Sequence, residues 1–304
     1  MEWLQALSPM SGVLLFIFLV FCAYLSGGLI GFFSMGYGDK KTLAWLEENK
    51  ADFSELFYKR EKKIITDRGC ESSIARPKRM RAYRVISALL YLALITVSPS
   101  AQGFLLLAVV FTILLWLSSV DIDSHHVPER FLYFLVIFEL GFFSFIPNAR
   151  WTGSEGILLG VFLVFSFVTL SIFIARRFIR GEQNEGSMIF GDGDILTLIA
   201  LTLFFGTDVL IALGVASFLF VVASVLKTPY LFLLDKVGHF TPLAATTHEM
   251  AFIPFIFIGL FFVVSMKLLG VMDLSTAIEQ LYLLVMFDGL FATALPPPLP
   301  NPSL

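Results

Sequence analysis

Apolar runs long enough to cross a membrane occur along most of the 304-residue chain. A helical crossing of the hydrocarbon core needs about 20 mainly apolar residues. Such runs lie near residues 10–33, 104–120, 131–147, 155–175, 188–205, 209–226 and 251–266. A shorter run at 85–97 predicts a tilted or partly buried helix, and 276–295 is ambiguous between a span and an interfacial helix. The pattern predicts an all-α polytopic membrane protein, a bundle of about eight transmembrane helices.

Composition supports this fold class. Hydrophobic residues make up 57% of the chain and charged residues 15%, with a mean hydropathy of +0.85, which is too apolar for a soluble fold. The two cysteines, Cys22 and Cys70, are too few for a disulfide framework or a four-cysteine zinc site.

Positive charge is concentrated between the first two apolar runs. Of the 21 Lys and Arg residues, 13 lie within 36–84, so this segment is expected in the cytoplasm and the N-terminus outside. Its apolar residues recur at helical spacing and predict a small helical insertion. The basic run 76–81 fits an anchor on anionic lipid, and nothing pairs these charges with a nucleic-acid recognition fold.

The chain is therefore expected to divide into four parts. Residues 1–35 form the first transmembrane helix, and 36–84 form the basic cytoplasmic segment. Residues 85–268 form the transmembrane core. Residues 269–304 hold an amphipathic or spanning helix and a proline-rich tail.

Two acidic motifs interrupt the apolar runs. Gly191-Asp192-Gly193-Asp194 lies inside the run at 188–205, and Asp121 directly follows the run at 104–120. A carboxylate at membrane depth is costly unless it faces a protein interior or a wet cavity, so both motifs are functional candidates. The alternative interpretation of the first motif is a polar turn between two helices. The topology places Asp121 and Asp194 at the same, cytoplasmic, membrane face.

Paired carboxylates can carry out aspartic peptidase chemistry. Two like charges held close together do not both ionise, so one carboxyl keeps its proton while the other takes a proton from water. The protonated partner then stabilises the oxygen that becomes charged when water attacks an amide. Glycines beside Asp194 would let an extended substrate backbone come close.

Three features of the sequence resemble the type IV prepilin peptidases. Residues 191–194 match the GxGD signature of membrane aspartyl peptidases. Asp121 is followed seven residues later by Pro128 and then Glu129, similar to the family's first-aspartate motif. The segment 252–259, with Pro254, is similar to the family's late proline-phenylalanine span. The resemblance covers residues 104–260 in the family's order.

The resemblance implies an enzyme of the bacterial cytoplasmic membrane that removes the leader from prepilin-like precursors at the cytoplasmic face. Its catalytic pair would be Asp121 and Asp194. The residues expected to shape the site or bind substrate are Gly191, Gly193, Pro128, Asp123, Asp192 and Pro254. No metal or other cofactor is expected for peptide cleavage, and S-adenosylmethionine is expected only if the chain also methylates its product. The chain departs from the family pattern at Glu129, Leu132 and Leu196, and 36–84 lacks the paired cysteines of many methylating members.

Several polar residues have two interpretations. Asp123 and Asp192 are expected to be solvated neighbours of the catalytic acids, with a divalent-cation site as the alternative. The four histidines, at positions 125, 126, 239 and 248, are expected to lie in interfacial loops. Glu139 is either a proton-bearing core acid or a contributor to the polarity of the site.

Two other functions remain open. One is a transporter or channel whose intramembrane acids bind a cation, and the other is a non-catalytic family member. A transporter should show two related halves. The chain shows no internal repeat, which favours the enzyme.

Overall fold

The computed structural model describes the protein as a set of helices. It covers residues 8–34, 44, 47–48, 50, 55–98, 100–124, 127–145, 151, 154–178, 192–237, 239 and 251–271. The helices are α2 (Pro9–Phe33), α4 (Glu55–Val97), α5 (Ala101–Ser124), α6 (Glu129–Phe145), α7 (Ser154–Phe178), α8 (Asp192–Phe205), α9 (Asp208–Val225), α10 (Lys227–Val237) and α12 (Ile253–Leu268). Because no strand occurs within these ranges, the predicted all-α class is confirmed for the described part of the chain.

Four of the described helices are long and apolar enough to cross a membrane. They are Met10–Phe33, Pro77–Val97, Ala101–Asp123 and Asp208–Val225. Three further apolar helices are shorter, at Glu155–Leu170, Gly193–Phe205 and Ile253–Leu268. The 14 residues of α8 give about 21 Å of helix at 1.5 Å per residue, less than the hydrocarbon core. The chain therefore has the helices of a membrane protein, and the structure identifies four candidate spans.

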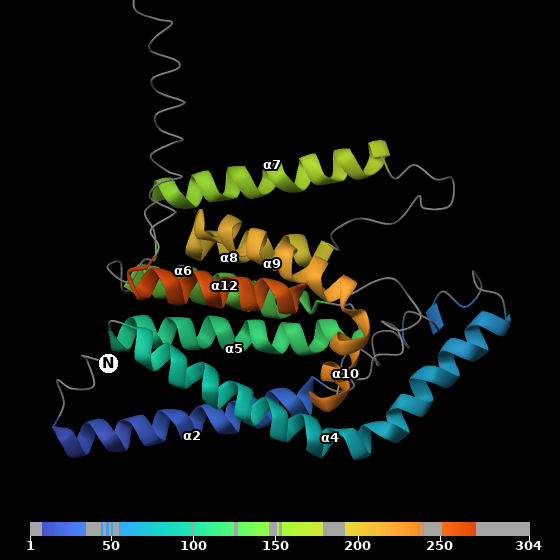
Figure 1. Ribbon diagram of the computed structural model, residues 1–304, viewed down its shortest axis with the longest axis horizontal. Coiled ribbons are helices and arrows are strands. Elements are labelled where there is room, and N and C mark those ends of the chain that lie inside the picture. Colours follow the sequence, from blue (N-terminus) through green and yellow to red (C-terminus); the bar gives the residue numbers. More distant parts are fainter. Residues whose placement is uncertain are drawn as a thin grey trace, which may run out of the picture.

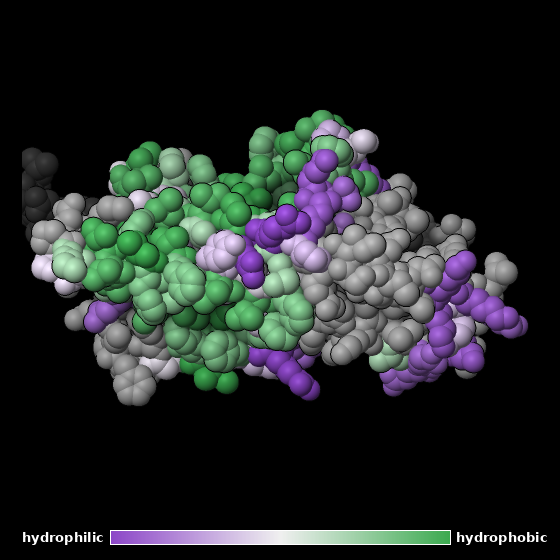
Figure 2. Space-filling model, turned by 90° about the horizontal axis from the view of Figure 1, so that it is seen from below, coloured by the Kyte–Doolittle hydropathy of each residue, from purple (hydrophilic) through white to green (hydrophobic). Residues whose placement is uncertain are grey.

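The helices stack in layers with α5 near the middle (Figure 1). In that view α2 and α4 lie below α5, α6 and α12 lie above it, and α8, α9 and α7 follow toward the top. In α5, 72% of the 18-residue apolar stretch is buried inside the protein, whereas the corresponding share is 22–33% in the other three candidate spans. Seen from the α2 side, apolar residues cover much of one half of the surface, and hydrophilic residues lie near the middle and at the other end (Figure 2). The core is thus built around α5, and the other spans keep large apolar faces exposed, as lipid contact requires.

Small residues let neighbouring helices approach closely. A Cβ atom at Gly27 of α2 would lie 2.2 Å from the Tyr83 carbonyl oxygen of α4, and one at Gly31 would lie 2.8 Å from Met80 Cα. These two glycines are one helical turn apart and form the small-xxx-small pattern of membrane helix pairs. On the other side of the core, a Cβ at Gly259 of α12 would lie 2.3 Å from the Ala212 carbonyl oxygen of α9. Glycine is therefore required for the α2–α4 and α9–α12 packing.

Helix α4 departs from the sequence prediction. The structure has one helix from Glu55 to Val97, with Pro77 inside it, so the expected boundary between residues 84 and 85 lies within the helix. The candidate span is 21 residues long, Pro77–Val97, where the apolar run predicted only a short helix over 85–97. The span can include basic residues in its first turns because one of them, Arg79, is buried in an ion pair that is described below.

The far end of the core is closed by a tight turn. Gly206 has φ of 57° and, with Thr207, connects α8 to α9. The Asp208 carboxylate is buried there, 2.8 Å from Lys267 Nζ of α12, and also accepts a hydrogen bond from Trp151 Nε1. This cluster ties α9 to α12 at the end of α8 opposite Asp194.

Candidate active site

Asp121 lies in the last turns of α5 and is 4% exposed. Its Oδ2 atom accepts a hydrogen bond of 3.1 Å from the backbone N–H of Ile253, the first residue of α12. The first N–H groups of a helix have no partner within the helix. Pro254 occupies the next position and has no N–H to bind. Asp121 therefore acts as a cap for the start of α12 and fixes that helix to the end of α5.

Asp194 reaches the same place from α8. It is the third residue of that helix and is partly exposed. It lies close enough to Asp121 for its charge to act on the Asp121 carboxyl. The two acidic motifs also touch through their neighbours, since a Cβ atom at Gly193 would lie 2.4 Å from Val127 Cγ2. Any larger residue at position 193 would push α8 away from the segment that follows α5.

The structure describes some of the remaining motif residues and not others. Pro128 is buried directly before α6, and its carbonyl oxygen accepts a hydrogen bond from the Phe131 N–H in the first turn. Gly191 and the side chain of Asp192 lie outside the described residues. So do His125, His126 and His248, the segment 276–295 and the tail. The described part thus brings together Asp121, Asp194, Gly193, Pro128 and the start of α12 at Pro254.

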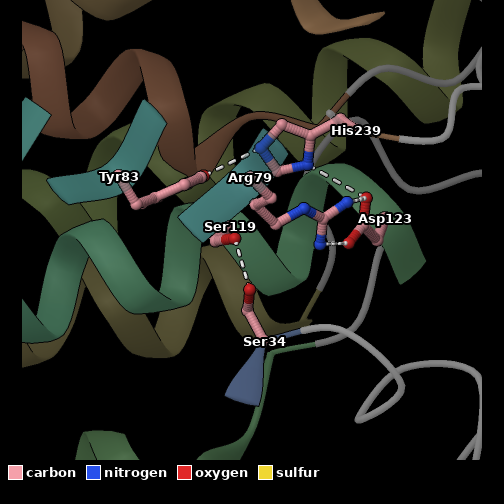
Figure 3. A network of polar contacts seen from close by, with 6 residues as sticks. All are labelled: Ser34, Arg79, Tyr83, Ser119, Asp123 and His239. Atoms are coloured by element: carbon pink, nitrogen blue, oxygen red, sulfur yellow. Dashed lines mark hydrogen bonds and ion pairs between the residues drawn. The ribbon is translucent and has the colours of Figure 1, made fainter. Parts of the chain in front are cut away.

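The expectation that Asp123 is a solvated neighbour is wrong. Its side chain is 15% exposed and binds both Nη atoms of Arg79, with Nη2 3.0 Å from Oδ1 (Figure 3). The Arg79 side chain is completely buried. Because residues two apart on a helix point in different directions, Asp123 faces α4 while Asp121 faces α12 and α8. The last turns of α5 therefore carry two carboxylates with separate partners.

His239 belongs to the same polar network. It lies outside any helix, after α10, in line with the expected loop position, but its side chain is buried. Its Nδ1 atom lies 3.0 Å from Asp123 Oδ1, and its Nε2 atom lies 2.8 Å from the Tyr83 hydroxyl (Figure 3). Burial lowers the pKa of His239, and the nearby positive charge of Arg79 acts in the same direction, against the opposing effect of Asp123. A neutral imidazole fits both contacts, with Nδ1–H donating to Asp123 and Nε2 accepting from Tyr83.

Sequence reasoning missed Arg79 and His239. The signal for Arg79 was its place in a helical stripe. The buried residues Arg79, Tyr83, Ser87, Leu90 and Leu94 are three or four positions apart along α4. A stripe that continues into a basic run identifies which base faces inward. No comparable pattern marks His239, whose place follows from the path of the chain after α10.

The described residues hold no group of three His, Cys, Asp or Glu side chains arranged to bind a metal ion. Asp121 and Asp123 have different partners, so these two carboxylates do not form a joint cation site. Glu139 of α6 is 1% exposed, and its carboxylate oxygens have no hydrogen-bond partner among the described residues. The divalent-cation interpretation of Asp192 stays a prediction, because its side chain lies outside the described residues.

The chain matches no family model, no curated protein and no solved structure.

Proposed function

We propose that this protein is a membrane aspartyl endopeptidase that removes the leader peptide from type IV prepilin-like precursors. The observation that carries the proposal is the pairing of Asp121 and Asp194 at the end of a buried helix. Two carboxylates that repel each other at a poorly solvated site favour a state in which one is protonated and the other is ionised. That state is the one aspartic peptidases use.

In the proposed reaction, the ionised carboxylate takes a proton from water as the water oxygen bonds to the peptide carbonyl carbon. The protonated carboxyl donates a hydrogen bond to the carbonyl oxygen as it becomes negative. The proton that was taken from water then passes from its carboxyl to the leaving nitrogen as the C–N bond breaks. The hydrogen bond from Ile253 to Asp121 holds one carboxylate in place, and the close Gly193–Val127 approach lets α8 present the other.

The placement in the membrane is also a proposal. We place the chain in the bacterial cytoplasmic membrane with its N-terminus outside and the Asp121–Asp194 pair facing the cytoplasm. The four candidate spans and the three shorter apolar helices support a bundle of about eight membrane helices. The precursor would present its leader at the cytoplasmic face while its hydrophobic segment lies among these helices. Peptide cleavage in this scheme uses no cofactor, and S-adenosylmethionine enters only if the product is methylated.

The test is co-production of the protein with a type IV prepilin in a bacterial strain that lacks its own prepilin peptidase. Mass spectrometry of the pilin N-terminus measures both leader removal and methylation. We expect cleavage by the wild type and by Asp235→Asn, whose side chain is 70% exposed. We expect none by Asp121→Asn or Asp194→Asn at equal amounts in the membrane, because an amide cannot exchange the proton. Normal processing by either variant would rule out the pair, and loss of cleavage in chelator, restored by magnesium, would indicate a metal mechanism.

One observation favours the second candidate, a cation transporter. Glu139 is buried and has no hydrogen-bond partner among the described residues, which is typical of intramembrane acids that carry a proton or an ion. Reconstituted vesicles loaded with a pH-sensitive dye distinguish the two functions. A transporter would move protons in the wild type and not in Glu139→Gln, whereas a peptidase would cleave prepilin in both.

A further inference from the structure

Helix α10 crosses the end of the bundle where Asp121 lies. It follows α9 after the single residue Leu226 and runs toward α4 past the end of α5 (Figure 1). None of its residues is fully buried, and Phe232 and Leu233 are largely exposed. Apolar packing of α10 is limited to partly buried residues such as Tyr230 and Val237, so specific polar contacts also help to hold the helix in place.

Tyr230 is the residue of α10 that faces the candidate site. Its ring packs against Phe255 in the first turn of α12, with ring centroids 5.8 Å apart. Burial and the charge of Asp121 raise the pKa of Tyr230 to about 12. The phenol consequently keeps its proton through the neutral range and is a hydrogen-bond donor there. Its hydroxyl has no hydrogen-bond partner among the described residues, so this donor is available near Asp121.

His239 fastens the other end of α10. Its backbone N–H donates a 2.9 Å hydrogen bond to the Leu234 carbonyl oxygen, which folds it back onto the last turn of the helix. Its ring is bound between Asp123 and Tyr83 (Figure 3). Asp123 is itself held by Arg79 and lies two residues from Asp121. The same stretch of α5 thus carries both the candidate catalytic acid and the anchor of α10.

A second contact between α10 and α4 is weaker. Lys78 Nζ donates a hydrogen bond to the Asp235 carbonyl oxygen and lies 3.6 Å from the Asp235 carboxylate, and both side chains are exposed. Such exposed ion pairs contribute little to stability. The buried His239 contacts are therefore the principal attachment.

We infer that α10 is a strap that holds the Tyr230 hydroxyl over the Asp121–Asp194 pair, and that His239 is the positioning residue that fastens it. This inference rests on the proposed peptidase function. During attack by water, Tyr230 would donate a hydrogen bond to the carbonyl oxygen of the scissile peptide as that oxygen becomes negative. Its own O–H bond stays intact, so the proton transfers remain those of the two carboxyls. Tyr230 would be a third catalytic residue, acting by stabilising charge.

The catalytic part is tested by Tyr230→Phe, which removes only the hydroxyl. With a purified type IV prepilin as substrate, we expect kcat to fall about 10- to 100-fold with KM nearly unchanged, as for loss of one oxyanion donor. The matched control is Tyr133→Phe on α6, whose side chain is exposed and which should keep the wild-type rate. A wild-type kcat in Tyr230→Phe would overturn the role of the hydroxyl.

The strap itself is tested without any activity, by amide hydrogen exchange of α10 in lipid nanodiscs. We expect His239→Ala to speed exchange of the α10 amides at least about 10-fold, because local opening no longer breaks the His239 contacts. His239→Asn should restore much of the protection, since its amide N–H can replace Nδ1–H toward Asp123. Lys78→Gln should change exchange less than about twofold because its pair is exposed.

The cleavage assay and the exchange measurement test the peptidase function and the strap independently of each other. If the wild type leaves prepilin uncut, the peptidase function and the role of Tyr230 both fail, while the exchange data still decide whether His239 holds α10. If cleavage occurs and α10 exchanges equally fast in wild type and His239→Ala, the strap is wrong and the peptidase stands.

Discussion

Arg79 of α4 and Asp123 of α5 form a two-point ion pair in which the arginine is completely buried. Taking two charges out of water costs several kcal/mol each, and their attraction offsets this only when the geometry is good. Two parallel N–H···O contacts provide that geometry. His239 adds a third contact to the same carboxylate. The pair therefore joins the span that follows the basic segment to the end of the helix that carries Asp121.

The first prediction concerns removal of one partner. Asp123→Ala leaves the Arg79 charge buried without its carboxylate and should lower the free energy of unfolding by about 3–5 kcal/mol. Thermal unfolding of the purified protein in detergent measures this. The double variant Arg79→Met/Asp123→Leu removes both charges and should recover most of the loss. Glu55→Ala, which breaks an exposed pair with Lys59, is the control and should cost less than about 1 kcal/mol. Equal stability of Asp123→Ala and the wild type would show that the Arg79 guanidinium group becomes hydrated in the variant.

The second prediction concerns pH. Because burial lowers the pKa of His239, the folded protein binds a proton there less readily than the unfolded chain does. Stability from the neutral ring is thus present above the unfolded pKa of about 6.5 and is lost as pH falls below it toward the folded pKa. The groups that face the ring are Asp123, Arg79 and Tyr83.

Thermal midpoints measured between pH 8 and pH 5 check this. The wild type should lose stability toward pH 5, and His239→Gln should lose less over the same range although it is less stable at pH 8. A steeper fall in the variant would mean that His239 is charged in the folded protein.

The sequence predicted the membrane class and the residues of the two acidic motifs, because apolar runs and motif spacing are local properties. It failed at Asp123 and Arg79 because a charge next to a membrane span is ordinarily solvated, and only a partner distant in the chain reverses that expectation. Asp123 and Arg79 are 44 residues apart, and His239 is 116 residues beyond Asp123. A burial pattern along one helix can identify an inward-facing base, but it cannot name the carboxylate that meets it.

The third prediction asks whether a glycine-to-alanine change acts through a steric contact between helices or through helix propensity. Gly193→Ala places a methyl group against the stiff side chain of Val127, so α8 must move and carry Asp194 away from Asp121. We expect prepilin cleavage to fall at least about 10-fold, as small misplacements of catalytic groups do. Gly214→Ala on α9 is the control, since a Cβ there meets nothing within 4 Å. That variant should cleave normally and be slightly more stable, because alanine favours the helix. Full activity in Gly193→Ala would show that α8 does not need this contact.

The last prediction concerns the opposite end of the core, where Asp208 pairs with Lys267. Asp208 is 2% exposed at its side chain and Lys267 is 28% exposed, so the two ends of this pair are not equivalent. Lys267→Met strands a buried carboxylate that keeps, among the described residues, only the hydrogen bond from Trp151. Asp208→Asn leaves the Lys267 ammonium group over the Trp151 ring and partly exposed to solvent, and the new amide oxygen can still accept from Trp151.

Lys267→Met should therefore lower the thermal midpoint more than Asp208→Asn, and the double variant should be no worse than Lys267→Met alone, because the stranded charge is gone. Leader cleavage per folded molecule should stay normal in all three, since the length of α8, about 21 Å, separates this cluster from Asp194. If Asp208→Asn were the more damaging change, the carboxylate would be capping α9 more than pairing with Lys267. If cleavage fell with stability intact, the two ends of the core would be coupled through α12, whose first residue binds Asp121 and whose last turn holds Lys267.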